Sequence, residues 1–366
     1  MNERSFRFAT FLLLLLVAGL LAQPYVDRLL FAATSPRAVT ARGDLAESER
    51  ATVSMFERVS PSVVQVVGAG SGAGGASDIE SDGVREQSGS GFIWDGAGHV
   101  VTNNHVVSGT QEVAVRLASG QVIGASIVGT APNYDLAVVR LRNTWQLPAP
   151  IAIGSSADLK VGQAAFAIGN PFGLDQSLTT GVISALKRRM PTSAGREIGN
   201  VVQTDAAVNP GNSGGPLLDS AGRLIGVTTA IISPSGSNAG IGFAIPVDTV
   251  NRVVPELISN GRVPTPGIGI VAANEAVATR LGIEGVVVVR TLPGSPAAQA
   301  GLRGIGQSGE LGDVIVSAGG QPTRRLSDLT DQLEAVGVGR EIELAVKRSD
   351  GSVTLRVRVE DIGRSS

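Results

Sequence analysis

The chain has 366 residues, of which 43% are hydrophobic and 17% are charged, so it can bury a large core and is not a disordered protein. The net charge of -2 argues against a nucleic-acid partner, which needs a basic surface. The absence of cysteine excludes disulfides and thiolate ligands, and with only two histidines we expect no metal and no cofactor. The 48 glycines and few aromatic residues favour many short strands joined by turns.

The N-terminus carries a hydrophobic targeting segment. An apolar run of 15 residues, Phe8 to Ala22, follows Arg4 and Arg7. This length fits a signal peptide and is less than the roughly 20 residues of a spanning helix. A second apolar patch follows at once without a clear cleavage site, so an uncleaved anchor is an equally good interpretation. We expect residues 1–33 to form a hydrophobic helix, either signal peptide or signal anchor, and the rest of the chain to be exported.

Residues 34–51 are polar and aperiodic, which predicts a flexible tether. From residue 52 to residue 259, β-branched segments alternate with glycine-rich turns, and this predicts β-barrels. The Gly/Ser-rich stretch Gly68 to Ser88 is expected to be a mobile surface loop, and Thr249 to Ser259 has the spacing of a closing helix. The predicted strands are Ser62–Val67, Gly89–Trp94, His99–Asn103, Glu112–Leu117, Ile123–Gly129, Leu136–Leu141, Ala164–Ile168, Leu178–Ile183, Leu224–Ala230 and Gly240–Ile245.

A second unit follows the turn residues of a linker at 260–266. Residues 267–361 predict a small β-sandwich with two helices, the second of which has Ser327 as its N-cap. The predicted strands are Ile268–Val271, Val286–Val289, Asp313–Val316, Glu341–Lys347 and Ser352–Val359, and the helices are Ser295–Ala300 and Leu326–Val336.

Three segments of the first unit carry residues suited to acyl transfer. A strand ends at His105, Asp135 precedes a buried strand, and Ser213 lies in a Gly/Pro-rich turn. A serine hydroxyl needs a neighbouring base at neutral pH, and a histidine base needs a carboxylate to hold its tautomer. The order His, Asp, Ser is that of the chymotrypsin arrangement. The amides of Gly211 and Ser213 can form an oxyanion hole.

Each of these residues also has a structural interpretation when taken alone. A histidine near a strand end is more often structural, and an aspartate before a strand is more often a turn residue. The combination, in an exported all-β chain, favours catalysis. The other histidine, His99, lies in a turn and is expected to be exposed and structural.

The segments that carry these residues closely resemble the HtrA/Deg family of trypsin-like serine proteases. They include GSGFIWDGAGHVVTNNHVV, YDLAVVRL, QTDAAVNPGNSGGPL and GIGFAIP, and the second unit resembles the family's PDZ domain through GIGI and GVVVVRTLPGSPAAQAGL. The resemblance implies a mainly β fold, with a chymotrypsin-like protease domain of two six-stranded barrels followed by one PDZ domain. It implies His105, Asp135 and Ser213 as the triad and homotrimeric assembly. It also implies ATP-independent cleavage of unfolded or misassembled envelope proteins.

In chymotrypsin-like enzymes the residue six positions before the nucleophile forms the floor of the primary specificity pocket. In this chain that residue is Ala207. A small apolar floor cannot neutralise a buried cation, so we expect cleavage after small or medium aliphatic residues. The neighbouring wall is expected from Thr228, Thr229, Ala230 and Ile231.

Two further segments suggest regulation. Residues Lys187 to Gly199 are basic and irregular, which is typical of a solvated hairpin loop; by resemblance this is the sensor loop, with Arg188 as the sensor arginine. In the second unit, Gly267, Ile268, Gly269 and Ile270 offer amides for a terminal carboxylate, and the following strand offers an edge for peptide C-termini. A plain interdomain sandwich is the alternative. Gly267 stands where relatives often have a bulky residue, which leaves the lining of that pocket open.

We therefore expect a periplasmic endopeptidase, secreted or anchored to the inner membrane by its N-terminal helix. Two alternatives remain from the sequence. The chain could be a PDZ-bearing chaperone or scaffold without proteolysis, although its triad is intact. It could also be a signalling protease that cuts one regulatory membrane protein when its PDZ domain senses exposed C-termini.

Overall fold

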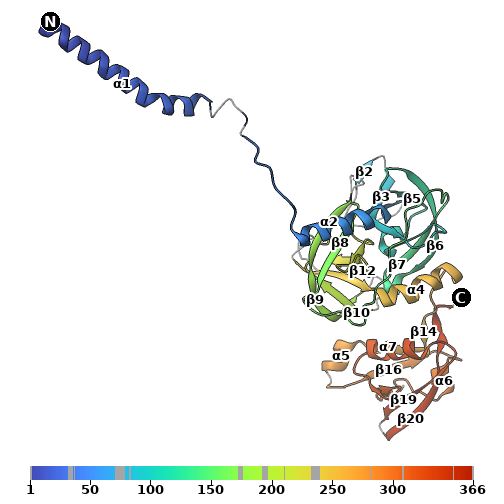
Figure 1. Cartoon of the computed structure of the whole chain (residues 1–366). Coiled ribbons are helices and arrows are strands. Elements are labelled where there is room, and N and C mark those ends of the chain that lie inside the picture. The colour runs from blue at the N-terminus through green and yellow to red at the C-terminus, as the bar shows by residue number, and fades with distance from the viewer. Residues whose placement is uncertain are drawn as a thin grey trace. The chain divides into compact units, whose positions relative to one another are not determined.

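The structure is a computed structural model, and it has a hydrophobic helix within residues 1–33, as the sequence predicts. The described residues are 2–31, 36, 38–70, 79–81, 84–171, 176–191, 197–209, 211–231, 240–280, 282–306, 309–348 and 350–364. Helix α1 covers Glu3–Phe31, 29 residues that run through Pro24 and beyond the predicted apolar run (Figure 1). Among the described residues it is the one helix long and apolar enough to cross a membrane. Signal peptides and anchors both have this composition.

Helix α2, Glu47–Val59, begins inside the segment predicted to be a flexible tether. It is amphipathic, and its apolar side buries Met55 and Val59 in the core of the two-barrel unit. Arg58 donates a 2.9 Å hydrogen bond to the carbonyl of Ala221. Both buried side chains lie after the polar residues 34–51, so the composition of those residues did not indicate the helix that begins at Glu47.

The first barrel is closed by six strands in the order β1, β5, β6, β7, β4 and β3, and β2 is attached to its edge. The prediction of a loop at 68–88 is partly wrong, because β1 and β3 both extend into this range. Residues 71–78 and 82–83 lie outside the described chain. The strands are β1 Val63–Gly70, β2 Ile79–Ser81, β3 Val84–Ile93, β4 His99–Thr102, β5 Glu112–Arg116, β6 Val122–Ala131 and β7 Leu136–Leu141.

The second barrel is closed in the order β10, β13, β12, β11, β8 and β9. The sequence missed β10, which begins within the basic segment, and the three-residue strand β11. The strands are β8 Ala164–Gly169, β9 Ser177–Pro191, β10 Glu197–Thr204, β11 Pro216–Leu218, β12 Leu224–Ile231 and β13 Gly242–Pro246. The prediction of two six-stranded barrels is confirmed.

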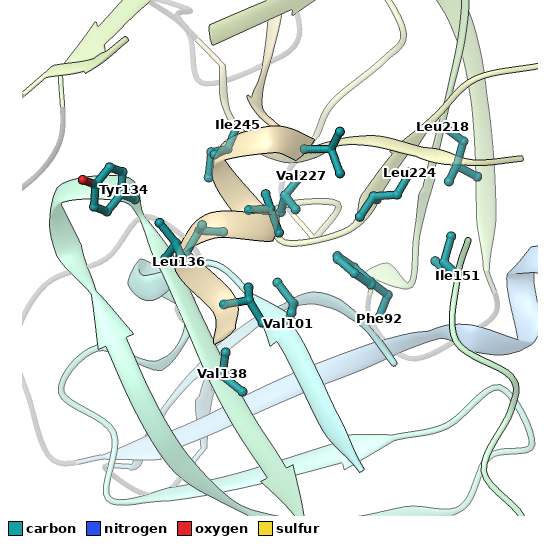
Figure 2. Close-up of a cluster of buried hydrophobic side chains, with 14 of the residues drawn as sticks. Phe92, Val101, Tyr134, Leu136, Val138, Ile151, Leu218, Leu224, Val227 and Ile245 are labelled. Atoms are coloured by element: carbon teal, nitrogen blue, oxygen red, sulfur yellow. The ribbon is translucent and has the colours of Figure 1, made fainter. Parts of the chain in front are cut away.

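One hydrophobic cluster joins the two barrels. Phe92, Val101 and Leu136 come from the first barrel and Leu218, Leu224 and Val227 from the second, as Figure 2 shows. Helix α4, Val247–Asn260, packs its valines and Leu257 into the same cluster. Burial of this apolar surface holds the facing ends of the barrels together. Residues carried by either barrel can therefore keep a fixed geometry across the boundary.

The second unit has a six-stranded sheet, in which β15, β16, β17, β19 and β20 follow in that order and β18 pairs with β17, and a separate pair β14 and β21. Its elements are β14 Pro266–Gly267, β15 Ile270–Ala272, α5 Glu275–Arg280, β16 Val286–Thr291, α6 Pro296–Gln299, β17 Val314–Ala318, β18 Gln321–Pro322, α7 Leu326–Val336, β19 Glu341–Arg348, β20 Gly351–Arg358, β21 Glu360–Asp361 and the 3-10 turn η4 Ile362–Arg364.

The N-cap prediction for α7 is wrong. Ser327 lies inside the helix, and the N-cap is Arg325. The carboxylate of Asp328 accepts hydrogen bonds from the amides of Arg324 and Arg325, at 3.0 and 3.2 Å. A carboxylate in the first turn of a helix satisfies free amides and favours the helix dipole, so it replaces a serine cap.

Candidate active site

The three predicted triad residues come from both barrels and meet at the boundary between them. His105 lies in the short helix α3, Asn104–Val107, because strand β4 ends at Thr102 rather than continuing to the histidine as predicted. Asp135 follows the 3-10 turn η2, Pro132–Tyr134. Ser213 lies in the turn between β10 and β11, and its carbonyl accepts a 2.8 Å hydrogen bond from the amide of Ser90 in the first barrel.

His105 and Asp135 form a close pair. The Nδ1 atom of His105 lies 2.9 and 3.0 Å from the two carboxylate oxygens of Asp135. The backbone N–H of His105 also donates to the Asp135 carboxylate, at 3.1 Å. A carboxylate on Nδ1 fixes the ring tautomer and leaves Nε2 to accept a proton. The histidine side chain is 47% exposed and the aspartate 14%, so the base is open to a substrate while its partner is sheltered.

Asp135 is fixed by its backbone as well as by its carboxylate. It has a φ of 50°, a left-handed conformation that aspartate tolerates better than most residues. Its carbonyl accepts hydrogen bonds from the Asn103 side chain at 2.8 Å and from the Asn104 amide at 3.1 Å. The hydroxyl of Thr229, on β12 of the second barrel, donates to its carboxylate at 2.5 Å. The aspartate is thus held from both barrels.

The hydroxyl of Ser213 points to a backbone carbonyl. Its Oγ donates a 2.7 Å hydrogen bond to the carbonyl of Thr229. Within the described part of the chain, Ser213 makes no hydrogen bond to His105. Catalytic hydrogen bonds are often incomplete without substrate. Proton transfer to the histidine requires rotation about the Cα–Cβ bond of Ser213.

The turn before Ser213 offers two amides for an oxyanion. In the chain as described, neither Gly211 nor Ser213 donates a hydrogen bond from its amide. The carbonyl of Gly211 accepts a 2.5 Å hydrogen bond from Ser90, which orients the turn. Gly211 has a φ of 99°, and a β-carbon there would lie 2.7 Å from Cβ of Pro171. Glycine is therefore required at this position by both conformation and space.

Ala207 and Thr228, two residues of the predicted specificity pocket, lie beside the same turn. Ala207 is half-buried, and its carbonyl accepts hydrogen bonds from Thr179 at 2.9 Å and from Asn212 at 3.2 Å. The hydroxyl of Thr228 donates to the carbonyls of Asn212 and Gly215. The hydroxyls of Thr228 and Thr229 thus support the nucleophile turn and Asp135, and only their backbone can face a substrate. Ala230 and Ile231 continue β12, and their side chains lie outside the described structure.

The prediction that His99 is exposed is wrong. His99 begins β4 and is only 8% exposed. Its Nδ1 atom lies 2.7 Å from the carboxylate of Asp95, four residues earlier. Burial acts to raise the pKa of Asp95, but the hydrogen bonds and charge of His99 hold that pKa below its usual range. His99 is a buried histidine paired with Asp95, which leaves His105 as the candidate base.

The basic segment from Lys187 to Gly199 is not the irregular loop that its composition predicts. Strand β9 extends to Pro191 and β10 begins at Glu197, in antiparallel register; residues 192–196 lie outside the described chain. Arg188 is exposed and donates a 3.1 Å hydrogen bond to Gln203 of the same barrel.

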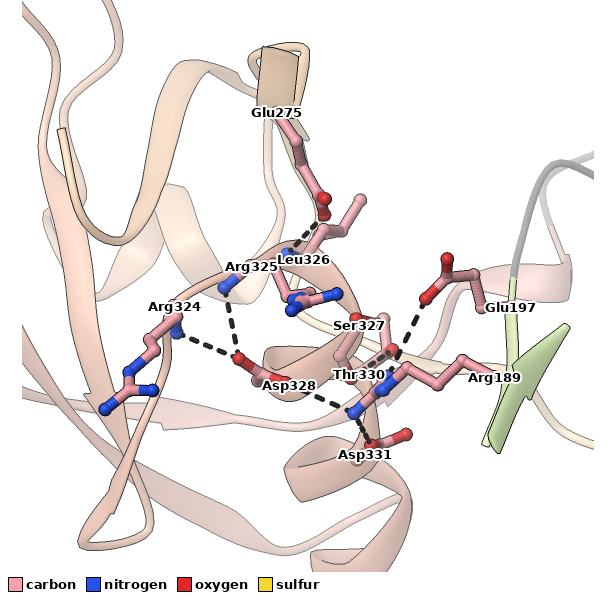
Figure 3. A network of polar contacts seen from close by, with 10 residues as sticks. All are labelled: Arg189, Glu197, Glu275, Arg324, Arg325, Leu326, Ser327, Asp328, Thr330 and Asp331. Carbon is pink, nitrogen blue, oxygen red and sulfur yellow. Dashed lines mark hydrogen bonds and ion pairs between the residues drawn. The ribbon is translucent and has the colours of Figure 1, made fainter. Parts of the chain in front are cut away.

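The next arginine reaches the PDZ domain. Figure 3 shows the Arg189 guanidinium between the carboxylates of Asp328 and Asp331 on α7, at 3.2 and 2.8 Å. The same guanidinium lies 3.9 Å from Glu197 on β10. A planar guanidinium that binds two carboxylates of one helix fixes the direction of that helix as well as its distance.

A second contact joins the domains beside the triad. Arg252 of α4 lies 3.6 Å from Glu334 of α7, and its guanidinium carbon is 5.1 Å from the ring centre of Tyr134. Tyr134 directly precedes Asp135. Burial, with the negative charge of Glu334 adding to it, raises the pKa of Tyr134 to about 12. The tyrosine is therefore neutral and packed at all physiological pH values.

The PDZ domain has a groove where the sequence predicts a carboxylate loop. The groove has a volume of about 440 Å³ and lies between residues 267–270 and the α7 side chains Leu326, Leu329, Thr330 and Leu333; Glu197 of the protease domain and Ile362 also line it. Gly269 has a φ of 76°, and a β-carbon there would collide with Ser295. Strand β15 beside the groove is an edge strand, so an added peptide strand could pair with it.

Four contributors to these sites were missed by the sequence analysis: Thr229 as support for Asp135, and Ser90, Arg189 and Ile362. Ser90 is separated in sequence from its partner Gly211 by 121 residues, and Thr229 from Asp135 by 94. No local pattern reports such a pairing. Among the described residues, no cluster of three or more His, Asp or Glu side chains could hold a metal ion.

Comparison with known proteins gives the same two domains. Residues 89–227 match the trypsin-like peptidase domain family and residues 265–359 match the PDZ domain family. Protease Do-like 1, chloroplastic, from Arabidopsis thaliana is 46% identical over 86% of this chain and 73% of its own length. The periplasmic serine endoprotease DegP of Salmonella typhimurium is 38% identical over 76% of this chain, which spans 58% of DegP. The solved structure of the HtrA-type protease AlgW with decapeptide has a TM-score of 0.69 and 33% identity, over 84% of this chain and 98% of that chain.

Proposed function

Because the chain belongs to the HtrA-type family of trypsin-like serine proteases, we propose that it cleaves unfolded or misassembled proteins of the cell envelope, without ATP, under the control of its PDZ domain. The observation that carries this proposal is the His105–Asp135 pair beside Ser213, in one chain with a peptide-sized groove.

The proposed mechanism uses His105, Asp135 and Ser213 in the roles of base, orienting carboxylate and nucleophile. Asp135 holds the ring of His105, and rotation of the Ser213 hydroxyl brings its proton to Nε2. Ser213 then attacks the substrate carbonyl, and the oxygen that becomes negative is bound by the amides of Gly211 and Ser213. His105 next protonates the leaving amine. The acyl-enzyme is hydrolysed by a water that His105 activates in the same way.

The substrate side chain before the cleaved bond is proposed to be small or aliphatic. Ala207 at the predicted pocket floor brings no charge, and the neighbouring hydroxyls of Thr228 and Thr229 are occupied by other partners. A cationic side chain would therefore be buried without a counter-charge. A peptide-library digest showing cleavage after Lys or Arg would contradict this assignment.

Regulation is proposed to start at the groove, where the amides of residues 267–270 receive the terminal carboxylate of a protein chain. Helix α7 forms one wall of that groove and carries the two carboxylates bound by Arg189. By resemblance, the neighbouring Arg188 is proposed as the sensor that passes the signal to the oxyanion hole. Peptide binding can shift the active site only if it favours one arrangement of these contacts over another.

The location proposed is the periplasm, with the chain secreted or held at the inner membrane by α1, and the assembly proposed is a homotrimer. DegP, named as a periplasmic endoprotease, supports the compartment. The length and hydropathy of α1 support either a signal peptide or an anchor. N-terminal sequencing of the membrane and soluble fractions distinguishes the two forms.

The test is digestion of β-casein by the wild type and by Ser213→Ala, each with and without peptides that end in a free carboxylate. We expect cleavage by the wild type and none by the variant. Equal inactivity of both proteins under all conditions would favour the chaperone or scaffold function instead.

A single-substrate signalling protease is the second candidate. The Ser213 hydroxyl donates to the carbonyl of Thr229 and not to His105, which favours a site that must be activated. In the casein assay, a signalling protease would show proteolysis that starts only after peptide is added. A constitutive quality-control enzyme would digest casein without it.

A further inference from the structure

The peptide groove contains a glycine whose backbone does not require one. Gly267 opens the loop of residues 267–270 and has no left-handed φ, in contrast to Gly269. An ordinary side chain is therefore compatible with its backbone conformation. A side chain at position 267 is prevented by a neighbouring residue, which occupies the space that the side chain would need.

That residue is Ile362, which lies 95 positions further along the chain. A β-carbon built on Gly267 would lie 2.5 Å from Cδ1 of Ile362 and 2.7 Å from its Cγ1 and Cγ2. Side chains never approach so closely, so Ile362 fills the volume that a residue 267 side chain would take. Both residues line the groove, and Ile362 is 38% exposed there.

Ile362 is held in this position by a short hook at the end of the fold. Strand β21 pairs with β14, so that Asp361 lies opposite Pro266. The Ile362 amide donates to the Thr265 carbonyl at 2.9 Å. The carboxylate of Asp361 accepts from the Thr265 amide at 2.9 Å and from Arg262 at 2.5 Å. With the Gly363 amide, which donates to the same carboxylate at 3.1 Å, these bonds fix the backbone on both sides of the isoleucine.

We propose that Ile362 replaces the missing side chain of residue 267 and sets the size of the C-terminal residue that the groove accepts. This inference rests on the proposed capture of C-termini. Its three outer carbons take up apolar space beside position 267, in the groove that Leu329 and Leu333 of α7 also line. The expected ligand is a protein C-terminus with a free carboxylate and a small or medium aliphatic last residue. Removal of those carbons opens the groove to larger, aromatic residues.

The test measures binding of fluorescein-labelled decapeptides that differ only in their last residue, Val, Leu, Phe or Trp, by anisotropy on the full chain in detergent. A Val peptide with an amidated C-terminus is the control for carboxylate capture. The wild type should prefer Val over Trp. Ile362→Ala should shift this ratio about tenfold toward Trp, the discrimination typical of a few methylene groups in an apolar pocket, and Ile362→Val should shift it less.

A swap of the two side chains sharpens the test. Gly267→Val alone should weaken binding of every peptide, because its side chain collides with Ile362. The double variant Gly267→Val with Ile362→Ala should recover the wild-type preference. Val338→Ala, at an exposed PDZ position away from the groove, should change nothing and serves as the matched control.

The outcomes separate this inference from the proposed function. Binding that does not depend on the free carboxylate would overturn the capture of C-termini, and this inference with it. Carboxylate-dependent binding whose Val-to-Trp ratio is the same in wild type, Ile362→Ala and the double variant would overturn the role of Ile362 alone.

Discussion

At the scale of single residues, Thr229 contacts two members of the proposed triad at once. Its carbonyl accepts the hydroxyl proton of Ser213, and its own hydroxyl donates to Asp135. The first contact uses backbone atoms that every residue has, and the second needs a side-chain donor. A substitution at this position can therefore remove one contact and keep the other.

We predict that Thr229→Val lowers kcat/KM by about tenfold to a hundredfold, because a hydrogen bond to a charged carboxylate contributes about 1.5 to 3 kcal/mol. Thr229→Ser keeps the donor and should retain most of the activity. Peptide-hydrolysis kinetics and a circular dichroism spectrum for each variant provide the check. Equal activity of the valine and serine variants would show that the contact does not position Asp135.

Substitution of Gly211 tests the proposed oxyanion hole without changing His105, the candidate base. Gly211→Ala must place a methyl group against Pro171 at a φ of 99°, so the turn has to move. We predict a loss of kcat of roughly a hundredfold or more, the range found when an oxyanion donor is lost. Gly109→Ala is the matched control, because Gly109 also has a positive φ, 75°, but has no atom within 4 Å of its β position. Similar losses in both variants would assign the effect to general strain.

At the scale of elements, the hook formed by β21 and η4 depends on one carboxylate. The hydrogen bond from Arg262 is the largest influence on Asp361 and, with the amides of Thr265 and Gly363, holds its pKa below the ordinary value despite partial burial. A lowered pKa means that the folded protein favours the charged carboxylate. The stability that it adds is present above the pKa of the unfolded chain and is lost as pH falls through the folded pKa.

We therefore predict a pH-dependent difference between the wild type and Asp361→Asn. The wild type should have the higher Tm between about pH 5 and 8, and the difference should shrink below about pH 4 and be lost as the pH falls through the lowered folded pKa of Asp361. Thermal unfolding of the full chain across this range measures it. Asp350→Asn, at an exposed position, is the control. A difference that persists unchanged at low pH would mean that Asp361 acts by shape and not by charge.

At the scale of the whole molecule, the protease and PDZ domains meet through helix α7. Its apolar side chains line the groove, while Asp328, Asp331 and Glu334 contact Arg189 and Arg252. The Arg252 contact ends on Tyr134, the neighbour of Asp135. One helix thus lines the groove on one side and, on the other, contacts Arg252, which lies over the neighbour of Asp135.

We predict that Arg189→Gln raises proteolysis in the absence of peptide by about two- to tenfold, because two partly exposed ion pairs that hold the present arrangement are lost. Arg188→Gln is the comparison variant: Arg188, the proposed sensor, donates to Gln203 of its own barrel, so its loss should weaken activation by peptide and not raise basal proteolysis. Casein digestion with and without C-terminal peptides measures both variants. If Arg188→Gln changes basal proteolysis more than Arg189→Gln does, the signal passes through Arg188, the sensor arginine that the family resemblance implies.

The sequence predicts those parts of the molecule that local patterns encode. Alternating apolar residues locate most strands of both barrels, and α7 is predicted at its observed bounds. The order of His105, Asp135 and Ser213 points to the site without knowledge of the fold. Strand β10 was missed because Glu197, Gly199 and Asn200 interrupt its β-branched residues, and tertiary pairing with β9 decides their conformation.

Other features depend on residues that only the fold brings together. His99 looked exposed because it follows a glycine turn, and its burial is made possible by Asp95. Ile362 follows the last strand and has no pattern that connects it with Gly267. Pairings between distant hydroxyls, carboxylates and methyl groups leave no periodic signal, so the sequence cannot report them.

The bond from Ser213 to the Thr229 carbonyl also has a consequence for chemical labelling. A fluorophosphonate reacts with a serine only when a base can take its proton, so molecules with this bond intact are unreactive at that moment. If rotation is fast, the labelling rate is the intrinsic rate multiplied by the fraction of molecules whose hydroxyl faces His105. The ratio of rates with and without a groove ligand then measures, in one number, how far the ligand shifts that rotamer equilibrium.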